Sequence, residues 1–105
     1  MNIPLSLIIT HFIADFVLQN DWMAHGKSKR FAPLFIHCLI YSSCFLLWGL
    51  KFAVFTGILH FIVDFVTSRI NIQLWNLQSK HWFFVSIGLD QLVHYVCLAA
   101  VFNLI

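Results

Sequence analysis

The chain has 105 residues, of which 61% are hydrophobic, six are Lys or Arg and four are Asp or Glu, for a net charge of +2. Its mean hydropathy is +0.88. A soluble domain of this size exposes more surface than so few charged residues can cover, so the composition excludes a water-soluble globule and predicts a membrane protein. Twelve Phe and four Trp residues also exclude a disordered chain.

The charge is too small and too scattered for nucleic-acid binding. The one basic cluster, Lys27, Lys29 and Arg30, is expected to lie at the membrane surface and to attract anions or lipid headgroups. Membrane lipids are therefore the expected partners, and a homo-oligomer is left open. The chain has three cysteines, Cys38, Cys44 and Cys97. They have no CxxC spacing and are odd in number, so we expect them to be small core residues that form no disulfide bonds.

Four apolar segments follow one another along the chain, at roughly residues 3–23, 33–50, 52–70 and 83–104. Each approaches the roughly 20 residues that a membrane-spanning helix needs. Because period-two alternation is absent, a β-barrel is excluded. The predicted fold class is all-α, an integral-membrane four-helix bundle that forms a single transmembrane domain over residues 1–105. The second and third segments meet at Gly49, which predicts a tight turn there.

Basic residues indicate the orientation in the membrane. Apart from Lys51 in the middle turn, they all lie in the first and third loops, which are therefore expected to be cytoplasmic. The sequence thus predicts a multi-pass membrane protein with both termini outside the cytoplasm. Residues 70–82 alternate apolar and polar side chains, which predicts a segment in the membrane interface or a plain loop.

An internal repeat relates the first and third segments. Residues 11–17 read HFIADFV and residues 60–66 read HFIVDFV. We therefore expect two helix hairpins related by duplication, with the first and third helices parallel and their equivalent faces close together.

Histidine and aspartate are paired at helical spacing in three of the segments. His11 precedes Asp15 by four residues, His60 precedes Asp64 by four, and Asp90 precedes His94 by four. Four residues is about one helical turn, so the members of each pair lie on one face of a helix. Counting helical rise from the expected cytoplasmic ends places all six residues, together with His37 of the second segment, at similar depths.

Three interpretations of this layer remain open. The pairs could be neutral hydrogen bonds that help helices pack. They could form a metal site, because imidazole and carboxylate suit zinc first, with manganese or iron as alternatives, and seven ligands could hold one or two ions. They could also ligate haem or conduct ions or protons. The number and type of the ligands favour the metal site, with these ligands: His11, Asp15, His37, His60, Asp64, Asp90 and His94.

Other polar residues are predicted to support that site. Gln19, Gln91 and Tyr41 lie about one turn from, or next to, a predicted ligand and are expected to orient the ligands by hydrogen bonds. The chain has no P-loop, GxSxG or HExxH motif, which excludes the corresponding nucleotide-binding, α/β-hydrolase and zincin sites.

These residues also resemble a known family, the bacterial and phage membrane proteins grouped as domain of unknown function 3307. The resemblance lies in H-x-x-x-D-F-x-L-Q from His11 to Gln19, the histidine at His37, H-x-x-x-D at His60, and D-Q-x-x-H from Asp90 to His94. The family is distantly similar to membrane-bound metal-dependent hydrolases, an analogy at the level of the fold. The resemblance also implies that the chain is a multi-pass protein of the bacterial inner (plasma) membrane.

The function expected from this sequence is metal-dependent hydrolysis near the cytoplasmic membrane face. Asp15, Asp64 and Asp90 are the candidate catalytic residues, because a carboxylate left free by the metal would act as general base. A phospholipid or an isoprenoid phosphate would suit a site at that depth. The alternatives are a metal-ion or proton transporter or channel, which needs access from both sides, and a haem-binding membrane protein.

Overall fold

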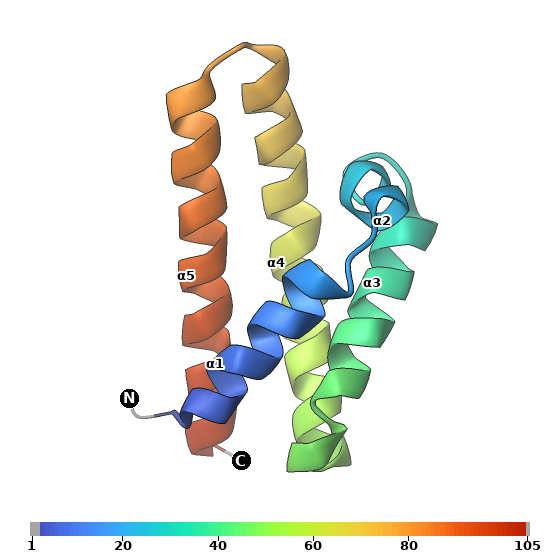
Figure 1. The fold of residues 1–105 in the computed structure, drawn as a ribbon, viewed down its shortest axis with the longest axis vertical. Helices are drawn as coiled ribbons and strands as arrows, with labels where there is room; N and C mark the ends of the chain where they lie inside the picture. Colours follow the sequence, from blue (N-terminus) through green and yellow to red (C-terminus); the bar gives the residue numbers. More distant parts are fainter. Residues whose placement is uncertain (1–2, 105) are drawn as a thin grey trace.

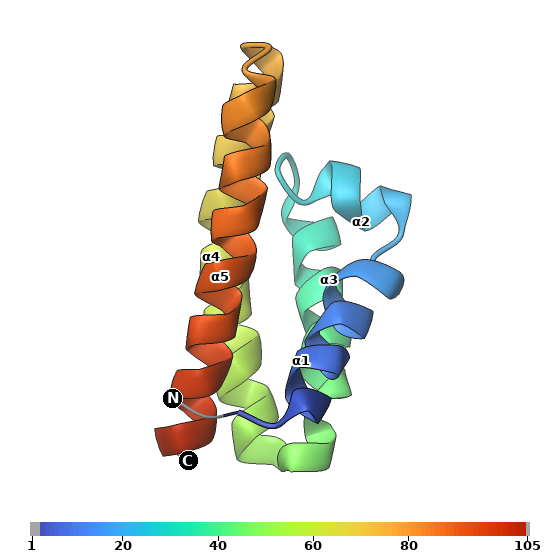
Figure 2. The same ribbon diagram turned by 60° about the vertical axis from the view of Figure 1, so that its left-hand side comes forward.

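The computed structural model describes residues 3–104, which form helices and turns and contain no strand. The predicted all-α fold class is confirmed for this part of the chain. The chain rises obliquely through α1 (Leu5–Phe12), descends through α3 (Phe31–Cys44), rises through α4 (Leu50–Asn76) and descends through α5 (Lys80–Leu104) (Figure 1). The hairpin of α4 and α5 forms one layer, and α1, α2 and α3 form a second layer beside it (Figure 2).

The first segment is not the single helix expected over residues 3–23. After α1 the chain makes one π-helical turn, η1 (Ile13–Val17), in which the Leu18 N–H donates to the Ile13 carbonyl five residues back. The backbone of Asn20 is extended, and its side chain accepts a hydrogen bond from the Met23 N–H at 2.9 Å. This N-cap begins a separate short helix, α2 (Asp21–Gly26). The Asn20 side chain satisfies a backbone N–H group that has no partner at the start of that helix.

The second segment begins earlier and ends earlier than the expected 33–50. α3 starts at Phe31, and Pro33 fits its first turn, where backbone N–H groups have no partner within the helix. α3 ends at Cys44 and is followed by a 3-10 turn, η2 (Leu46–Trp48). The turn into α4 lies at Gly49, whose φ of 104° favours glycine.

The last two helices are longer than the expected 52–70 and 83–104. α4 continues to Asn76 and α5 begins at Lys80, so most of residues 70–82 is helical and not a plain loop. No proline or glycine interrupts residues 70–76, and the helix continues because it packs against α5 there, as in the contact of Trp75 with Phe83 at 5.1 Å between ring centroids. The resulting hairpin extends beyond α2 and the start of α3 (Figures 1 and 2).

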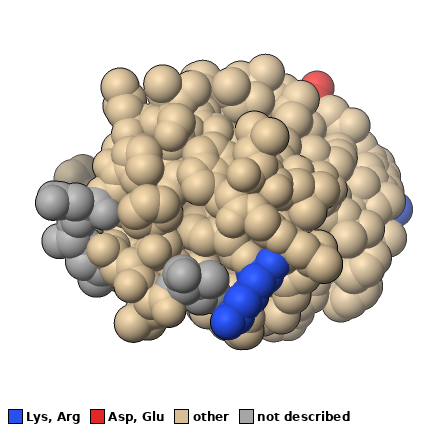
Figure 3. All heavy atoms as spheres, turned by 90° about the horizontal axis from the view of Figure 1, so that it is seen from below, with Lys and Arg blue, Asp and Glu red and all other residues tan. Residues whose placement is uncertain are grey.

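Polar and apolar residues are distributed the opposite way from a soluble protein. Large Phe, Leu, Ile and Val side chains on the outer helix faces are exposed, whereas four of the six histidines and three of the four aspartates are buried. Few charged side chains project from the end of the molecule where α1 begins and α5 ends (Figure 3). By length and composition α4 and α5 could each cross a membrane, whereas the apolar helices at Leu5–Val17 and Phe31–Cys44 are shorter.

Candidate metal centre

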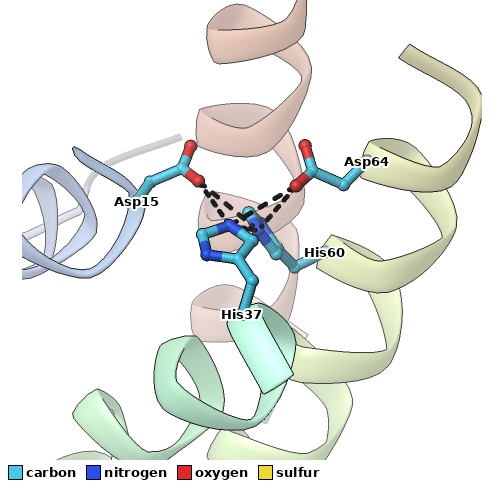
Figure 4. Close-up of side chains that lie close together, drawn as sticks. All are labelled: Asp15, His37, His60 and Asp64. Atoms are coloured by element: carbon cyan, nitrogen blue, oxygen red, sulfur yellow. Dashed lines mark hydrogen bonds and ion pairs between the residues drawn. The ribbon is translucent and has the colours of Figure 1, made fainter. Parts of the chain in front are cut away.

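Four buried side chains from three parts of the chain point toward one another. Asp15 comes from η1, His37 from α3, and His60 and Asp64 from α4 (Figure 4). We call these residues the four-residue group. One nitrogen or oxygen atom of each lies within 4.8 Å of the corresponding atom of every other. The repeat thus contributes both carboxylates, one from each copy.

The distances within the four-residue group are close to those between ligands of a tetrahedral metal ion. His37 Nε2 lies 3.0 Å from Asp15 Oδ1 and 3.4 Å from Asp64 Oδ2, and His60 Nε2 lies 3.5 Å from each of these oxygens. The two Nε2 atoms are 3.1 Å apart. Four ligands about 2.0 to 2.1 Å from a central zinc ion would be separated by about 3.4 Å. The side chains therefore need little movement to enclose an ion.

A second group, Asp15, Asp90 and His94, shares Asp15 with the first. We call it the three-residue group. His94 Nε2 lies 3.2 Å from Asp90 Oδ1 and 3.5 Å from Asp64 Oδ1, so His94 is next to both groups. The Thr67 hydroxyl donates to Asp90 Oδ1 at 2.6 Å.

His11 lies in the same layer, but hydrogen bonds engage both of its ring nitrogens. Nδ1 is 2.8 Å from the Tyr41 hydroxyl, and Nε2 is 2.7 Å from Gln91 Oε1. The Gln91 amide donates to Asp15 Oδ2 at 3.2 Å and to Asp90 Oδ2 at 3.1 Å. Since carboxylates only accept, the amide oxygen must face His11, which then donates from Nε2 and accepts from Tyr41. His11 therefore orients Gln91, and Gln91 holds both carboxylates, as expected of a supporting residue.

Lys27, expected at the membrane surface with Lys29 and Arg30, has a partner in the buried layer. Its ammonium nitrogen lies 3.0 Å from Asp64 Oδ2 and its side chain is half-buried at the cleft, whereas Lys29 and Arg30 are exposed. Burial alone would lower the pKa of the Lys27 ammonium, but the charges of Asp64 and Asp15 outweigh burial and raise the pKa above its ordinary value. Lys27 therefore places a positive charge beside the four-residue group at neutral pH.

A cleft of about 550 Å³ leads from the surface to these residues. It lies between the α2 region and the part of the α4–α5 hairpin that extends beyond it, and its lining includes Asp15, Lys27, Asp90 and Gln91. Gln19 also lines the cleft. On the other side of the layer the buried core closes the bundle with these residues: Leu7, Tyr41, Phe45, Phe52, Leu98 and Val101.

Comparison with known protein families matches residues 3–105 to the family described as "Protein of unknown function (DUF3307)". The chain belongs to this family. The match spans nearly the whole sequence and confirms the resemblance that its histidine and aspartate motifs suggested. No curated protein and no solved structure matches the chain.

Sequence reasoning missed two contacts of this DUF3307 chain. It placed Lys27 at the membrane surface and did not pair it with Asp64, and it did not consider Thr67 as a partner of Asp90. The sequence did contain a signal for the buried face of α4, because Thr56, His60, Asp64 and Ser68 recur every four residues, and all four are buried. That signal does not include Thr67. No comparable signal exists for Lys27, because its partner lies 37 residues away in the chain.

Proposed function

We propose that this chain is an integral membrane protein of the bacterial inner membrane, of bacterial or phage origin, with four helices arranged as two hairpins and both termini outside the cytoplasm. The observation that supports membrane insertion is the exposure of large apolar side chains around a buried polar layer. In this arrangement α4 and α5 cross the bilayer, α2 lies at the cytoplasmic surface, and the end of the α4–α5 hairpin extends beyond it. Trp75 and Trp82, both exposed near that end, suit the interface.

We further propose that the four-residue group binds one divalent ion, zinc first, with manganese or iron as alternatives. The observation that carries this proposal is the convergence of two imidazole nitrogens and two carboxylate oxygens at near-tetrahedral distances.

The balance of buried charge supports the same proposal. Asp15, Asp64 and Asp90 are three buried carboxylates, and Lys27 opposes them with one positive charge, which leaves a net charge of −2 if the histidines are neutral. One divalent ion would bring that sum to zero, and an uncompensated charge away from water is costly. Two protonated histidines would have the same effect, so metal content must be measured directly.

The chemistry that this centre would support is hydrolysis. A divalent ion lowers the pKa of a water molecule next to it, which supplies hydroxide near neutral pH. Asp90 lines the cleft and is held by Thr67 and Gln91, so its carboxylate is placed to accept a proton from water. Among the described residues, the cleft opens at one end of the molecule, and the apolar core closes the other end.

Access from one end favours an enzyme over the transporter or channel that remains the alternative function. A transport site must be reached from both sides of the membrane, and on the far side of the layer the cavity next to His60 and His94 measures only about 10 Å³. Haem is disfavoured by the close packing of the rings. His60 stacks on Tyr41 at 3.7 Å and on His94 at 4.3 Å between centroids, which leaves no space for a porphyrin between them.

Metal analysis of protein purified in detergent without chelator tests this proposal. We expect about one divalent ion per chain, and its loss in His37→Ala and Asp64→Asn, because each substitution removes a ligand. His81→Ala is the matched control, since His81 is exposed and outside both groups, and it should keep the ion. Wild-type protein that carries no ion and unfolds at the same temperature with and without chelator would favour hydrogen-bonded packing instead. A Soret absorption band would favour haem.

A further inference from the structure

Three polar atoms that line the cleft are buried and have no hydrogen-bond partner among the described residues. They are Ser68 Oγ, Asn71 Oδ1 and Gln19 Oε1. The Ser68 residue exposes only 5% of its surface. A buried polar group without a partner costs free energy, so three such atoms in the lining of one cleft indicate a polar ligand.

Two of these atoms continue the line of the metal centre along α4. Ser68 and Asn71 follow Asp64 by one and two helical turns on the same face. Lys27, at the inner end of this line, uses one of its three N–H donors on Asp64. The polar lining of the cleft therefore includes a cation and a hydroxyl, which suit an anion, and two amide oxygens, which accept from hydroxyl groups.

Much of the remaining lining of the cleft is apolar. Phe16, Ile72, Trp75, Phe83 and Ile87 line it. Phe83 and Ile87 come from α5 and lie four residues apart, so they form one stripe along that helix. Ile72 and Trp75 continue the α4 face that carries Ser68 and Asn71. A ligand that fills the cleft must therefore offer both hydrocarbon and polar atoms.

We infer that the cleft binds a phospholipid whose headgroup is a phosphodiester bearing free hydroxyl groups. The phosphate contacts Lys27 and Ser68, the headgroup hydroxyls donate to Asn71 and Gln19, and the acyl chain packs on the apolar residues of the lining. The assignment of this lipid as the substrate, in contrast to its binding, rests on the proposed hydrolase function.

The reaction on such a lipid balances without a further reactant. The oxygen of one water molecule bonds to phosphorus, and the P–O bond to the hydroxylated headgroup breaks. The headgroup alcohol leaves with one proton of the water, and the lipid phosphate retains the other. Asp90, at the inner end of the cleft, carries the proton between the two oxygens.

Calorimetric titration of the purified protein in maltoside detergent tests the inference with three probes. We expect lauroyl lysophosphatidylglycerol to bind more tightly than dodecylphosphocholine, which lacks headgroup hydroxyls, and more tightly than glycerol 3-phosphate, which lacks the chain. Ser68→Ala and Asn71→Ala should each weaken binding of the first probe about tenfold, the effect of losing one hydrogen bond to a charged or buried partner. Ser68→Thr restores the hydroxyl and should bind normally, and Ser43→Ala, an exposed serine on α3, is the control.

Metal content measured on the same samples separates this inference from the proposed function. The Ser68→Ala protein should hold as much metal as wild type, and a loss of metal would assign Ser68 to the metal centre and overturn the inference. Unchanged affinity in Ser68→Ala and Asn71→Ala, or equal affinity for glycerol 3-phosphate, would also overturn it. Metal-free wild type would overturn the proposed function alone, because the lipid contacts proposed for Lys27, Ser68 and Asn71 require no metal.

Discussion

At the scale of single residues, Asp15 is the side chain on which both candidate groups depend. Its Oδ1 lies in the four-residue group, and its Oδ2 accepts from Gln91, which also donates to Asp90. We therefore expect Asp15→Asn to remove the bound ion, while Asp90→Asn leaves the four-residue group intact and keeps about one ion per chain. Elemental analysis of the two variants checks this. Equal metal content in both would contradict the division into two groups.

A double-mutant cycle on Asp15 and Asp64 tests whether the two copies of the repeat build one site. If both carboxylates bind the same ion, each single Asn variant loses it, and the double variant has no more to lose, so the effects on metal content are strongly non-additive. Independent hydrogen-bonded pairs predict additive losses of about 1 to 2 kcal/mol or less in stability. Thermal unfolding in detergent with and without chelator measures both. Additive losses that ignore the chelator would exclude the shared site and the hydrolase function.

At the scale of helices, α3 and α4 meet at a glycine. A Cβ atom at Gly57 would lie 2.8 Å from the Cβ and the hydroxyl of Ser42, whose hydroxyl donates to the Ala53 carbonyl at 2.6 Å. This close approach sets the distance between the helices that carry His37 and His60.

We expect Gly57→Ala to lower the free energy of unfolding by about 1 to 3 kcal/mol, because the helices must move apart to admit a methyl group. Gly88→Ala is the matched control, since nothing lies within 4 Å of its Cβ position, and alanine should there be neutral or stabilise by up to about 1 kcal/mol. Thermal or denaturant unfolding in detergent compares the two variants. Similar stability of both would show that the contact at Ser42 does not hold α3 against α4.

At the scale of the whole molecule, the proposed topology places the α2 region and the end of the α4–α5 hairpin on the same side of the membrane. In a variant without the three native cysteines, single cysteines at Lys29 and Asn76, both exposed, should be labelled from the cytoplasmic side. A cysteine at Lys51, exposed near the opposite end, should be labelled from outside. Labelling of Lys29 and Asn76 from outside would reverse the orientation, and labelling of all three from one side would contradict membrane spanning.

The sequence by itself determined the helical class, the family and the residues of the polar layer. These follow from composition and from helical period, since residues four apart share a face whatever the helix packs against. For the same reason the burial of His60, Asp64, Asp90 and His94 on inward faces agrees with the spacing of their motifs.

Only the tertiary structure decided which of these residues meet. The spacing pairs His11 with Asp15, but those side chains lie 3.7 Å apart, whereas Asp15 lies 3.0 Å from His37 on another helix. The position of Lys27 on Asp64, the π turn that carries Asp15 and the cleft beside Ser68 were equally invisible in the sequence. Contacts between helices depend on the rotation and relative height of each helix, and these are set by packing across the whole molecule, which no local spacing encodes.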